Sequence, residues 1–277
     1  MCQTQASWVQ SETVWSSFIA LGDSFTEGLD DTRADGTFRG WADRLAAQMH
    51  ERNPDLHYAN LAIRGRTAER IAREQVPAAV AQQPDLVSFA AGINDLMTPG
   101  WQPARTFAAI DDSLRRLRSA GADVLVVAFG DPKDRASINR LRSRFELLNR
   151  GTVMLAREHG CYLLDFWPLT THAADDYWSE DRLHLSALGH EVTAAAAAEV
   201  LGFGDSGWRE EVIPWDGKPA FPARLRADTR WVAKHGGPWV LRKFRGQSSG
   251  ESVQPKRPAL LAMSAEPLEP LEPLEPQ

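Results

Sequence analysis

Four short segments of the chain contain the residue types that ester hydrolysis by an activated serine requires. That reaction needs a nucleophile, a general base, a group that orients the base, and hydrogen-bond donors for the developing oxyanion. The segments are GDSF at 22–25, the turn at Gly65, GIND at 92–95 and DRLH at 181–184. The first three come just after short apolar runs, and DRLH follows the last run across a loop rich in Trp and Asp, so these residues are candidates for one shared site.

The chemistry of each residue type predicts its role. Ser24 can attack a carbonyl carbon, and His184 can take the hydroxyl proton and later return it to the leaving alcohol. Asp181, three residues before His184, can reach the imidazole and hold the required tautomer. We therefore expect Ser24, Asp181 and His184 to be catalytic.

Three hydrogen-bond donors are available for the oxyanion. They are the backbone N–H groups of Ser24 and Gly65 and the side-chain amide of Asn94. Glycine at position 65 allows the backbone to approach a substrate with no Cβ in between. We expect these three residues to form the oxyanion hole.

Each of these residues also has an ordinary structural explanation. Ser24 could cap a helix, Asn94 could be a turn residue, and Asp181 with His184 could be an exposed loop pair. Together these explanations require several coincidences at one edge of a sheet. A metal site built from His184, His190 and Asp181 matches no standard spacing, so we expect neither a metal nor a cofactor.

Short apolar runs alternate with amphipathic segments from residue 17 to residue 202. The apolar runs predict strands at 17–21, 56–61, 85–91, 122–130 and 161–166. The intervening segments predict helices near 38–52, 67–83, 103–119, 135–159 and 186–201. This alternation predicts a flavodoxin-like α/β fold, a three-layer α/β/α sandwich with a five-stranded parallel sheet. Because ligands bind at the carboxyl ends of parallel strands, the four segments should meet at that edge.

On these residues the chain resembles the GDSL, or SGNH, hydrolases over about residues 17–202. GDSF, the Gly65 turn, GIND and DRLHLSALGH (181–190) are similar to the four signature blocks of that family, in the same order. Phe25 stands in place of the leucine of GDSL, which is a familiar variation. The segments GTFRGWADRLA and EQVPAAVAQQPDLVSFAAGINDL are similar to a subgroup common in high-GC Gram-positive bacteria.

The resemblance implies an SGNH hydrolase fold and an esterase or lipase that acts on ester bonds. It also implies that Ser24, Gly65, Asn94 and His184 are the family's invariant residues and that Asp181 is the acid of the triad. We expect hydrolysis through an acyl-enzyme. Short-chain acyl or acetyl esters are favoured, because no long apolar loop suggests a tunnel for a lipid.

The loops that follow the strands contain an apolar set with two interpretations. Its members are Met97, Trp101, Trp167 and Trp178. They could line an acyl-binding site, or they could only pack the loops. The same triad could also serve an acyltransferase, a thioesterase, a lysophospholipase or a carbohydrate deacetylase. A non-catalytic binding module that keeps the fold is a further alternative.

The composition changes after residue 202. Residues 203–245 are rich in Trp and Arg, which predicts a helical extension packed on the main domain; a surface for an anionic partner is the alternative. The repeated PLE triplets in residues 246–277 predict a disordered, polyproline-like tail. Residues 1–16 are predicted to be an N-terminal extension and residues 17–202 the hydrolase domain.

The net charge and the distribution of apolar residues indicate which classes of partner to expect. A net charge of −6 gives no reason to expect a nucleic-acid partner. No window approaches 18 uninterrupted apolar residues, and the N-terminus has no signal-peptide pattern, so we expect no integral membrane association. Two cysteines suit a reducing compartment. We expect a cytoplasmic protein, a monomer or weak oligomer, with a small-molecule ester as its substrate.

Overall fold

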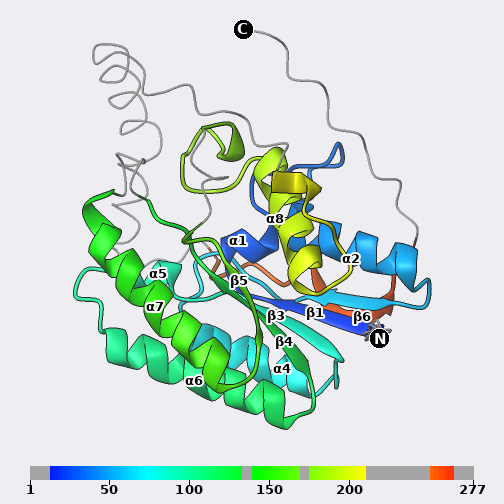
Figure 1. Cartoon of the computed structure of the whole chain (residues 1–277), viewed down its shortest axis with the longest axis horizontal. Coiled ribbons are helices and arrows are strands. Elements are labelled where there is room, and N and C mark those ends of the chain that lie inside the picture. The colour runs from blue at the N-terminus through cyan, green and yellow to red at the C-terminus, as the bar shows by residue number, and fades with distance from the viewer. Residues whose placement is uncertain (1–12, 133–138, 169–174, 210–249, 265–277) are drawn as a thin grey trace, which may run out of the picture.

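The computed structural model describes residues 13–132, 139–168, 175–209 and 250–264. These residues form an α/β fold in which a mostly parallel sheet lies between two layers of helices (Figure 1). The strands are β1 (Ser17–Leu21), β2 (His57–Asn60), β3 (Leu86–Phe89), β4 (Asp123–Ala128), β5 (Tyr162–Asp165) and β6 (Arg257–Ala262). The predicted fold class is confirmed, and all five predicted strands are present.

The strand order explains where the functional edge lies. The sheet has the order β5-β4-β3-β1-β2-β6, in which the first five strands are parallel and β6 is antiparallel to β2. Every residue of β3, and every residue of β4 except the first, is buried. Strands covered on both faces are mostly apolar, which is why these runs are visible in the sequence.

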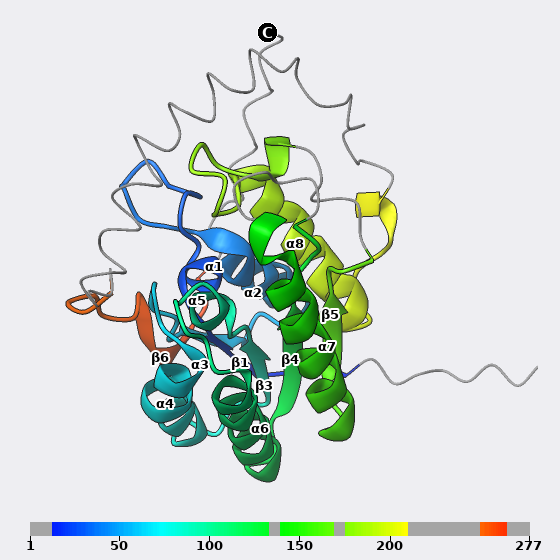
Figure 2. The same cartoon turned by 90° about the vertical axis from the view of Figure 1, so that its left-hand side faces the viewer.

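Helices cover both faces of the sheet (Figure 2). One face carries α2 (Gly40–Arg52) and α8 (Ala187–Val200), which pack on each other and on the core around Phe18 and Tyr58. The other face carries α6 (Pro103–Ser119) and α7 (Arg142–Glu158), which pack on the core around Ile19 and Val87. Shorter elements are α1 (Ser24–Glu27), α5 (Ile93–Leu96) and the 3-10 turns Asn139–Leu141, Asp175–Tyr177 and Gly207–Arg209.

The helix predicted over 67–83 is divided into three parts. They are α3 (Ala68–Arg70), a π-helical turn (Ile71–Gln75) and α4 (Val76–Val80). Pro77 has no N–H, so it cannot make the hydrogen bond that a regular helix would place there. The backbone N–H of Val76 instead reaches back five residues to the carbonyl of Ile71. The π turn therefore ends just before the proline.

The prediction of a disordered tail over 246–277 was wrong for residues 250–264. β6 pairs with the edge strand β2, with Tyr58 opposite Leu261 and Asn60 opposite Arg257. Flanking prolines and acidic repeats concealed this short apolar run. Pro258 is tolerated because β6 is an edge strand, and an edge strand has a neighbour on one side only. On the open side a missing N–H breaks no hydrogen bond to another strand. The sheet therefore has six strands.

The boundaries of the predicted domains stay predictions. Two buried tryptophans lie near the ends of the predicted hydrolase domain. Trp15 lies in the predicted extension, yet it is buried, and its Nε1 donates to Asp123 at 3.0 Å. Trp208 is also buried and donates to Glu199 at 2.8 Å. Residues 210–245 of the predicted helical extension lie outside the described residues. None of the described helices is long and apolar enough to cross a bilayer.

Candidate active site

The site lies at the carboxyl ends of the two central strands, β1 and β3. These strands are neighbours, but β2 lies on the far side of β1 and β4 on the far side of β3. Such a switch in strand order opens a crevice at the strand ends. Ser24 begins α1 just after β1, and Asn94 lies in α5 just after β3. The fold thus places both predicted residues at the crevice.

The serine, histidine and aspartate predicted to be catalytic are in mutual contact. The Nε2 atom of His184 lies 3.0 Å from the Oγ atom of Ser24. Its Nδ1 atom lies 2.6 Å from Oδ2 of Asp181. Both distances are within hydrogen-bond range, so the imidazole connects the hydroxyl to the carboxylate. This is the order of groups that a serine nucleophile and its base require.

Asp181 also organises the loop that presents His184. Its second carboxylate oxygen accepts hydrogen bonds from Ser179 Oγ at 2.7 Å and from the backbone N–H groups of Leu183 and His184 at 2.8 and 2.9 Å. The loop closes where Trp178 pairs with Leu185. One carboxylate therefore fixes both the backbone and the ring of His184.

The charges around the imidazole shift two pKa values in opposite directions. Burial alone would lower the pKa of His184, but the hydrogen bond and charge of Asp181, with the charges of Asp30 and Asp23, raise it above its usual range. Burial alone would raise the pKa of Asp181, but its hydrogen bonds to the ring and backbone of His184 hold it well below its usual value. Asp181 is therefore ionised at neutral pH and stabilises the protonated imidazole.

The turn that carries Ser24 is held by a residue that the sequence did not indicate. The buried side chain of Gln75 accepts from the backbone N–H of Gly22 at 2.9 Å and donates to its carbonyl at 2.8 Å. A Cβ at Gly22 would lie 2.5 Å from Thr26 Oγ1, so only glycine fits. Such irregularities in helices are often functional, and this π turn places Gln75 against the turn that leads into Ser24.

Asn94 links the turns that carry the other two predicted oxyanion donors. Its Nδ2 atom donates to Oδ2 of Asp23 at 2.8 Å and to the backbone carbonyl of Arg66 at 3.2 Å. Asp23 directly precedes Ser24, and Arg66 directly follows Gly65. The three donors are therefore tied into one neighbourhood. Both Asn94 amide hydrogens already have acceptors, so oxyanion binding requires one of them to be shared or released.

The Gly65 turn is fixed by a second residue that sequence reasoning missed. Gly65 has φ of 76°, a left-handed conformation that favours glycine. The buried carboxylate of Glu27 accepts the backbone N–H of Arg64 at 2.7 Å and also pairs with the Arg64 guanidinium. Glu27 ends the helix that Ser24 begins, so α1 and the Gly65 turn are joined by this carboxylate.

His190 is not part of a metal cluster with His184. It is buried, its Nδ1 accepts the backbone N–H of Trp41 at 3.1 Å, and its Nε2 donates to the carbonyl of Leu29 at 3.1 Å. Burial lowers its pKa to about 4, so the ring is neutral and both nitrogens are used. The structure therefore contradicts a shared metal site for these two histidines.

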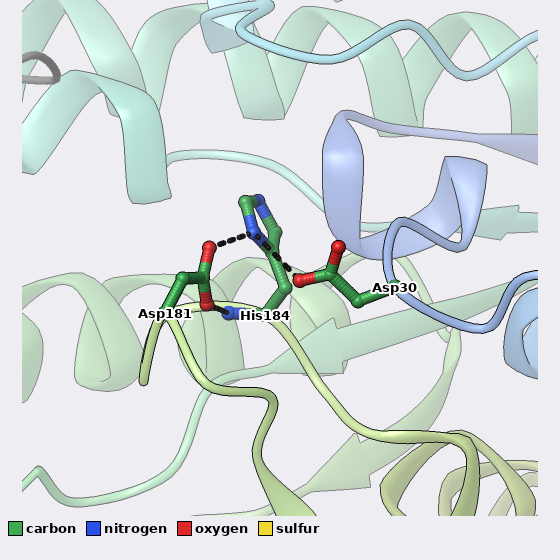
Figure 3. A group of neighbouring side chains, drawn as sticks. All are labelled: Asp30, Asp181 and His184. Carbon is green, nitrogen blue, oxygen red and sulfur yellow. Dashed lines mark hydrogen bonds and ion pairs between the residues drawn. The ribbon is translucent and has the colours of Figure 1, made fainter. Parts of the chain in front are cut away.

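One other group among the described residues has metal-ligating atoms close together. Asp30, Asp181 and His184 each offer such an atom, and these atoms lie within 4.8 Å of one another (Figure 3). A cation there would compete for the Nδ1 atom of His184, which Asp181 already holds at 2.6 Å. The arrangement fits a hydrogen-bonded imidazole better than a coordinated ion, since a metal-bound Nδ1 carries no proton.

The four apolar residues predicted to line an acyl site are all half-buried in the packed loops. Met97, Trp101 and Trp167 pack on the core beneath α6 and α7, whereas Trp178 packs on the opposite core. Trp101 also donates its indole N–H to Thr106 at 2.9 Å. Their role in binding stays a prediction, because packing alone explains these contacts.

One family model matches most of the chain. The family model described as "GDSL-like Lipase/Acylhydrolase family" matches residues 20–192, which contain all four segments. Comparison with curated protein sequences gives no significant match.

Several solved structures are similar in fold. An α/β hydrolase enzyme from the metagenome of Lake Arreo, Spain, is 23% identical with a TM-score of 0.59, over 69% of this chain and 97% of that chain. An acetylxylan esterase from Geobacillus stearothermophilus is 18% identical with a TM-score of 0.55, over 69% and 97%. The psychrotrophic esterase EstA from Pseudoalteromonas sp. is 16% identical with a TM-score of 0.54, over 67% and 96%. Identities this low support the shared fold.

Proposed function

Because the chain belongs to the GDSL-like lipase/acylhydrolase family, and so is an esterase-type hydrolase of ester bonds, we propose that it uses a Ser24-His184-Asp181 triad. One observation carries this proposal: the imidazole of His184 contacts Ser24 Oγ through Nε2 and Asp181 through Nδ1, at 3.0 and 2.6 Å. No second orientation of the ring would let it serve both groups.

The first half of the reaction forms an acyl-enzyme. Ser24 Oγ attacks the ester carbonyl carbon while Nε2 of His184 takes the hydroxyl proton. The resulting imidazolium is stabilised by the ionised Asp181. The carbon–oxygen bond to the alcohol then breaks, and His184 returns its proton to the leaving oxygen.

The second half regenerates the enzyme. Water attacks the acyl carbon, and His184 takes a proton from that water. The bond to Ser24 Oγ breaks, the proton passes from the imidazole to this oxygen, and the carboxylic acid leaves. Asp181 keeps the ring in one orientation throughout both halves.

The oxyanion is proposed to be held by the backbone N–H groups of Ser24 and Gly65 and by the amide of Asn94. The support is that Asn94 is bonded to the neighbours of both other donors. The hydrogen bond from Asn94 to the Arg66 carbonyl is the longer of its two bonds. On substrate binding, this N–H would be shared between the Arg66 carbonyl and the substrate oxygen. Losing one such donor typically costs about 10²–10³ in rate.

For the substrate, we propose short-chain acyl or acetyl esters. The support is the absence of a long apolar loop in the sequence, together with the similarity to a solved acetylxylan esterase. Thioesterase, lysophospholipase and acyltransferase activities use the same groups and are the alternatives. A place in the subgroup of high-GC Gram-positive bacteria and a cytoplasmic location also stay proposals, resting on the sequence.

The test is a hydrolysis screen with 4-nitrophenyl esters of increasing acyl length, acetylated sugars and acyl thioesters. We expect the highest kcat/KM for acetyl to butyryl esters. Ser24→Ala is the control and should lose this activity. Preferred turnover of long acyl chains or thioesters would reject the proposed substrate class, and product partitioning with added alcohols separates transfer from hydrolysis.

A further inference from the structure

A second carboxylate lies beside the imidazole of His184. Oδ2 of Asp30 is 3.7 Å from Nδ1 of His184, the same nitrogen that Asp181 contacts at 2.6 Å. Figure 3 shows the two carboxylates approaching the ring from different segments, Asp30 from the loop after α1 and Asp181 from the loop before α8. The Nδ1–H therefore has one near acceptor and a second one slightly beyond hydrogen-bond distance.

The backbone of Asp30 has an unusual conformation that the surrounding residues hold in place. Its φ is 70°, in the left-handed region that few residues other than glycine occupy. On one side, the carbonyl of Leu29 accepts from the buried His190 at 3.1 Å. On the other side, the buried carboxylate of Asp31 accepts from Nε of Arg44 at 2.9 Å. Two buried anchors thus flank Asp30, whose side chain approaches the imidazole.

There is open space for the Asp30 carboxylate to move. Asp30, Ser179, Glu180 and Asp181 line one open cavity of about 330 Å³. The Asp30 side chain is 40% exposed, so it is not held by close packing. The side chain therefore borders open space beside the carboxylate of Asp181.

We propose that Asp30 is a second positioning residue for His184, which shares the Nδ1–H with Asp181 and accepts it when Asp181 is absent. This rests on the proposed function of His184 as the general base. Asp30 touches neither the substrate nor the reacting atoms, so it acts only through the ring. Its effect is smaller than that of Asp181, because an exposed carboxylate at 3.7 Å is partly screened by water.

The charges that face the ring come from three segments. Asp181 lies on the loop before α8, Asp30 on the loop after α1, and Asp23 at the start of α1; all three raise the pKa of His184. Removing Asp30 alone should therefore move the pH dependence of the base toward lower pH, with the other two charges still present. A residue that merely stabilised the loop would leave this dependence unchanged.

The variant Asp30→Asn tests the proposal with little change in the backbone. Asparagine tolerates the left-handed conformation and has nearly the same shape. Asp30→Gly is the second variant, since it removes the carboxylate and also relieves any backbone strain. Asp35→Asn is the matched control: it lies in the same loop, and its carboxylate contacts Thr37 and not the histidine. Thermal unfolding verifies that each variant is folded.

The readouts are the acid limb of kcat/KM and a double-mutant cycle with Asp181→Ala. We expect both Asp30 variants to move the acid limb to lower pH, more at low than at high salt, and Asp35→Asn to leave it in place. In the wild-type background Asp30→Asn should lower kcat/KM about two- to fivefold. In the Asp181→Ala background it should cost about tenfold or more, because no carboxylate then remains on Nδ1.

An unmoved acid limb, or equal losses in both backgrounds, would overturn the role of Asp30. That result is distinct from failure of the proposed function. If the wild-type protein hydrolyses esters and Ser24→Ala does not, the triad stands whatever Asp30 does. If the two proteins have equal activity, the triad itself is rejected.

Discussion

The carboxylate of Glu27 accepts the backbone N–H of Arg64 at 2.7 Å, and thereby joins the helix that begins with Ser24 to the turn that carries Gly65. Two segments separated in the sequence by one helix, α2, and one strand, β2, are thus fixed relative to each other. The proposed nucleophile and one proposed oxyanion donor lie at the two ends of this connection. We therefore predict that Glu27 positions these two segments for the reaction.

Replacing Glu27 should lower the rate more than it weakens binding. In Glu27→Ala the turn at Gly65 loses its anchor, so we expect kcat to fall about 10- to 100-fold with KM changed little. Steady-state kinetics on a short-chain ester measure this. Glu69→Ala is the matched control, because Glu69 is exposed and pairs with Arg105 on the surface. A folded Glu27 variant with unchanged kcat would contradict this role.

The pH dependence of the reaction should reflect the raised pKa of His184. The imidazole must be neutral to take the serine proton, so activity rises as the pH increases through this pKa. Because Asp181 and the other two carboxylates raise it above 6.5, the midpoint of kcat/KM should lie above 6.5. A profile that is flat between about pH 5 and 8, or a midpoint below this value, would exclude His184 as the base.

Asp23 should make the protein less stable as the pH rises. Burial raises its pKa to about 6, although the Phe25 N–H, the charge of His184 and the Asn94 amide lower it in part. Between the unfolded value of 3.8 and about 6, the folded state binds more protons than the unfolded state, so stability falls with rising pH through this window. In Asp23→Asn this cost disappears.

The melting temperatures of Asp23→Asn and the wild type therefore give a testable difference. Relative to the wild type, the melting temperature of Asp23→Asn should be higher at pH 7.5 than at pH 5. Its activity should fall, because Asn94 loses a charged hydrogen-bond acceptor. Melting curves at the two pH values provide the measurement. If the melting temperatures of the two proteins differ by the same amount at both pH values, Asp23 is not a buried carboxylate that ionises in this range.

Lys256 should contribute to stability far more than a surface lysine. Its Nζ atom donates to the carbonyls of Glu27, Phe38 and Arg39 at 2.7, 3.2 and 2.7 Å, and to the Asp43 carboxylate at 2.8 Å. Lys256→Met removes the donor to the three carbonyls, while Asp43 keeps its hydrogen bond from Tyr58. We expect a loss of about 2–4 kcal/mol in the free energy of unfolding.

Arg105→Met is the comparison for Lys256→Met. Arg105 and its partner Glu69 are both exposed, so this ion pair should contribute less than about 1 kcal/mol to the free energy of unfolding. Denaturant unfolding of the two variants measures both values. Through Lys256, residues 250–264 contact the end of the loop between α1 and α2. Equal losses of unfolding free energy in the two variants would mean that this contact does not stabilise the loop.

The sequence predicted the parts of this structure that depend on local pattern. The five parallel strands are visible because buried strands need continuous apolar runs. The contact between Ser24 and His184 was predicted from chemistry: a serine after one strand and a histidine after another meet at one edge of the sheet. Asp181 was within reach because it lies three residues before that histidine.

The sequence did not predict the residues that act through tertiary contacts. Gln75 and Glu27 are single polar residues in amphipathic or loop sequence, and only the folded chain brings them to the backbone of Gly22 and Arg64. β6 was missed because it pairs with β2, a strand far away in the sequence, and no local pattern marks such a pairing. Such long-range pairings leave no periodicity from which to predict them.

Covalent labelling tests the central claim most directly. The protein is treated with a fluorophosphonate probe, and the modified residue is identified by mass spectrometry. We predict one phosphonylated serine, Ser24, with no label in Ser24→Ala and slow labelling in His184→Ala. A protein that hydrolyses esters with Ser24 unlabelled, or that keeps its activity in Ser24→Ala, would contradict the claim that this serine is the nucleophile.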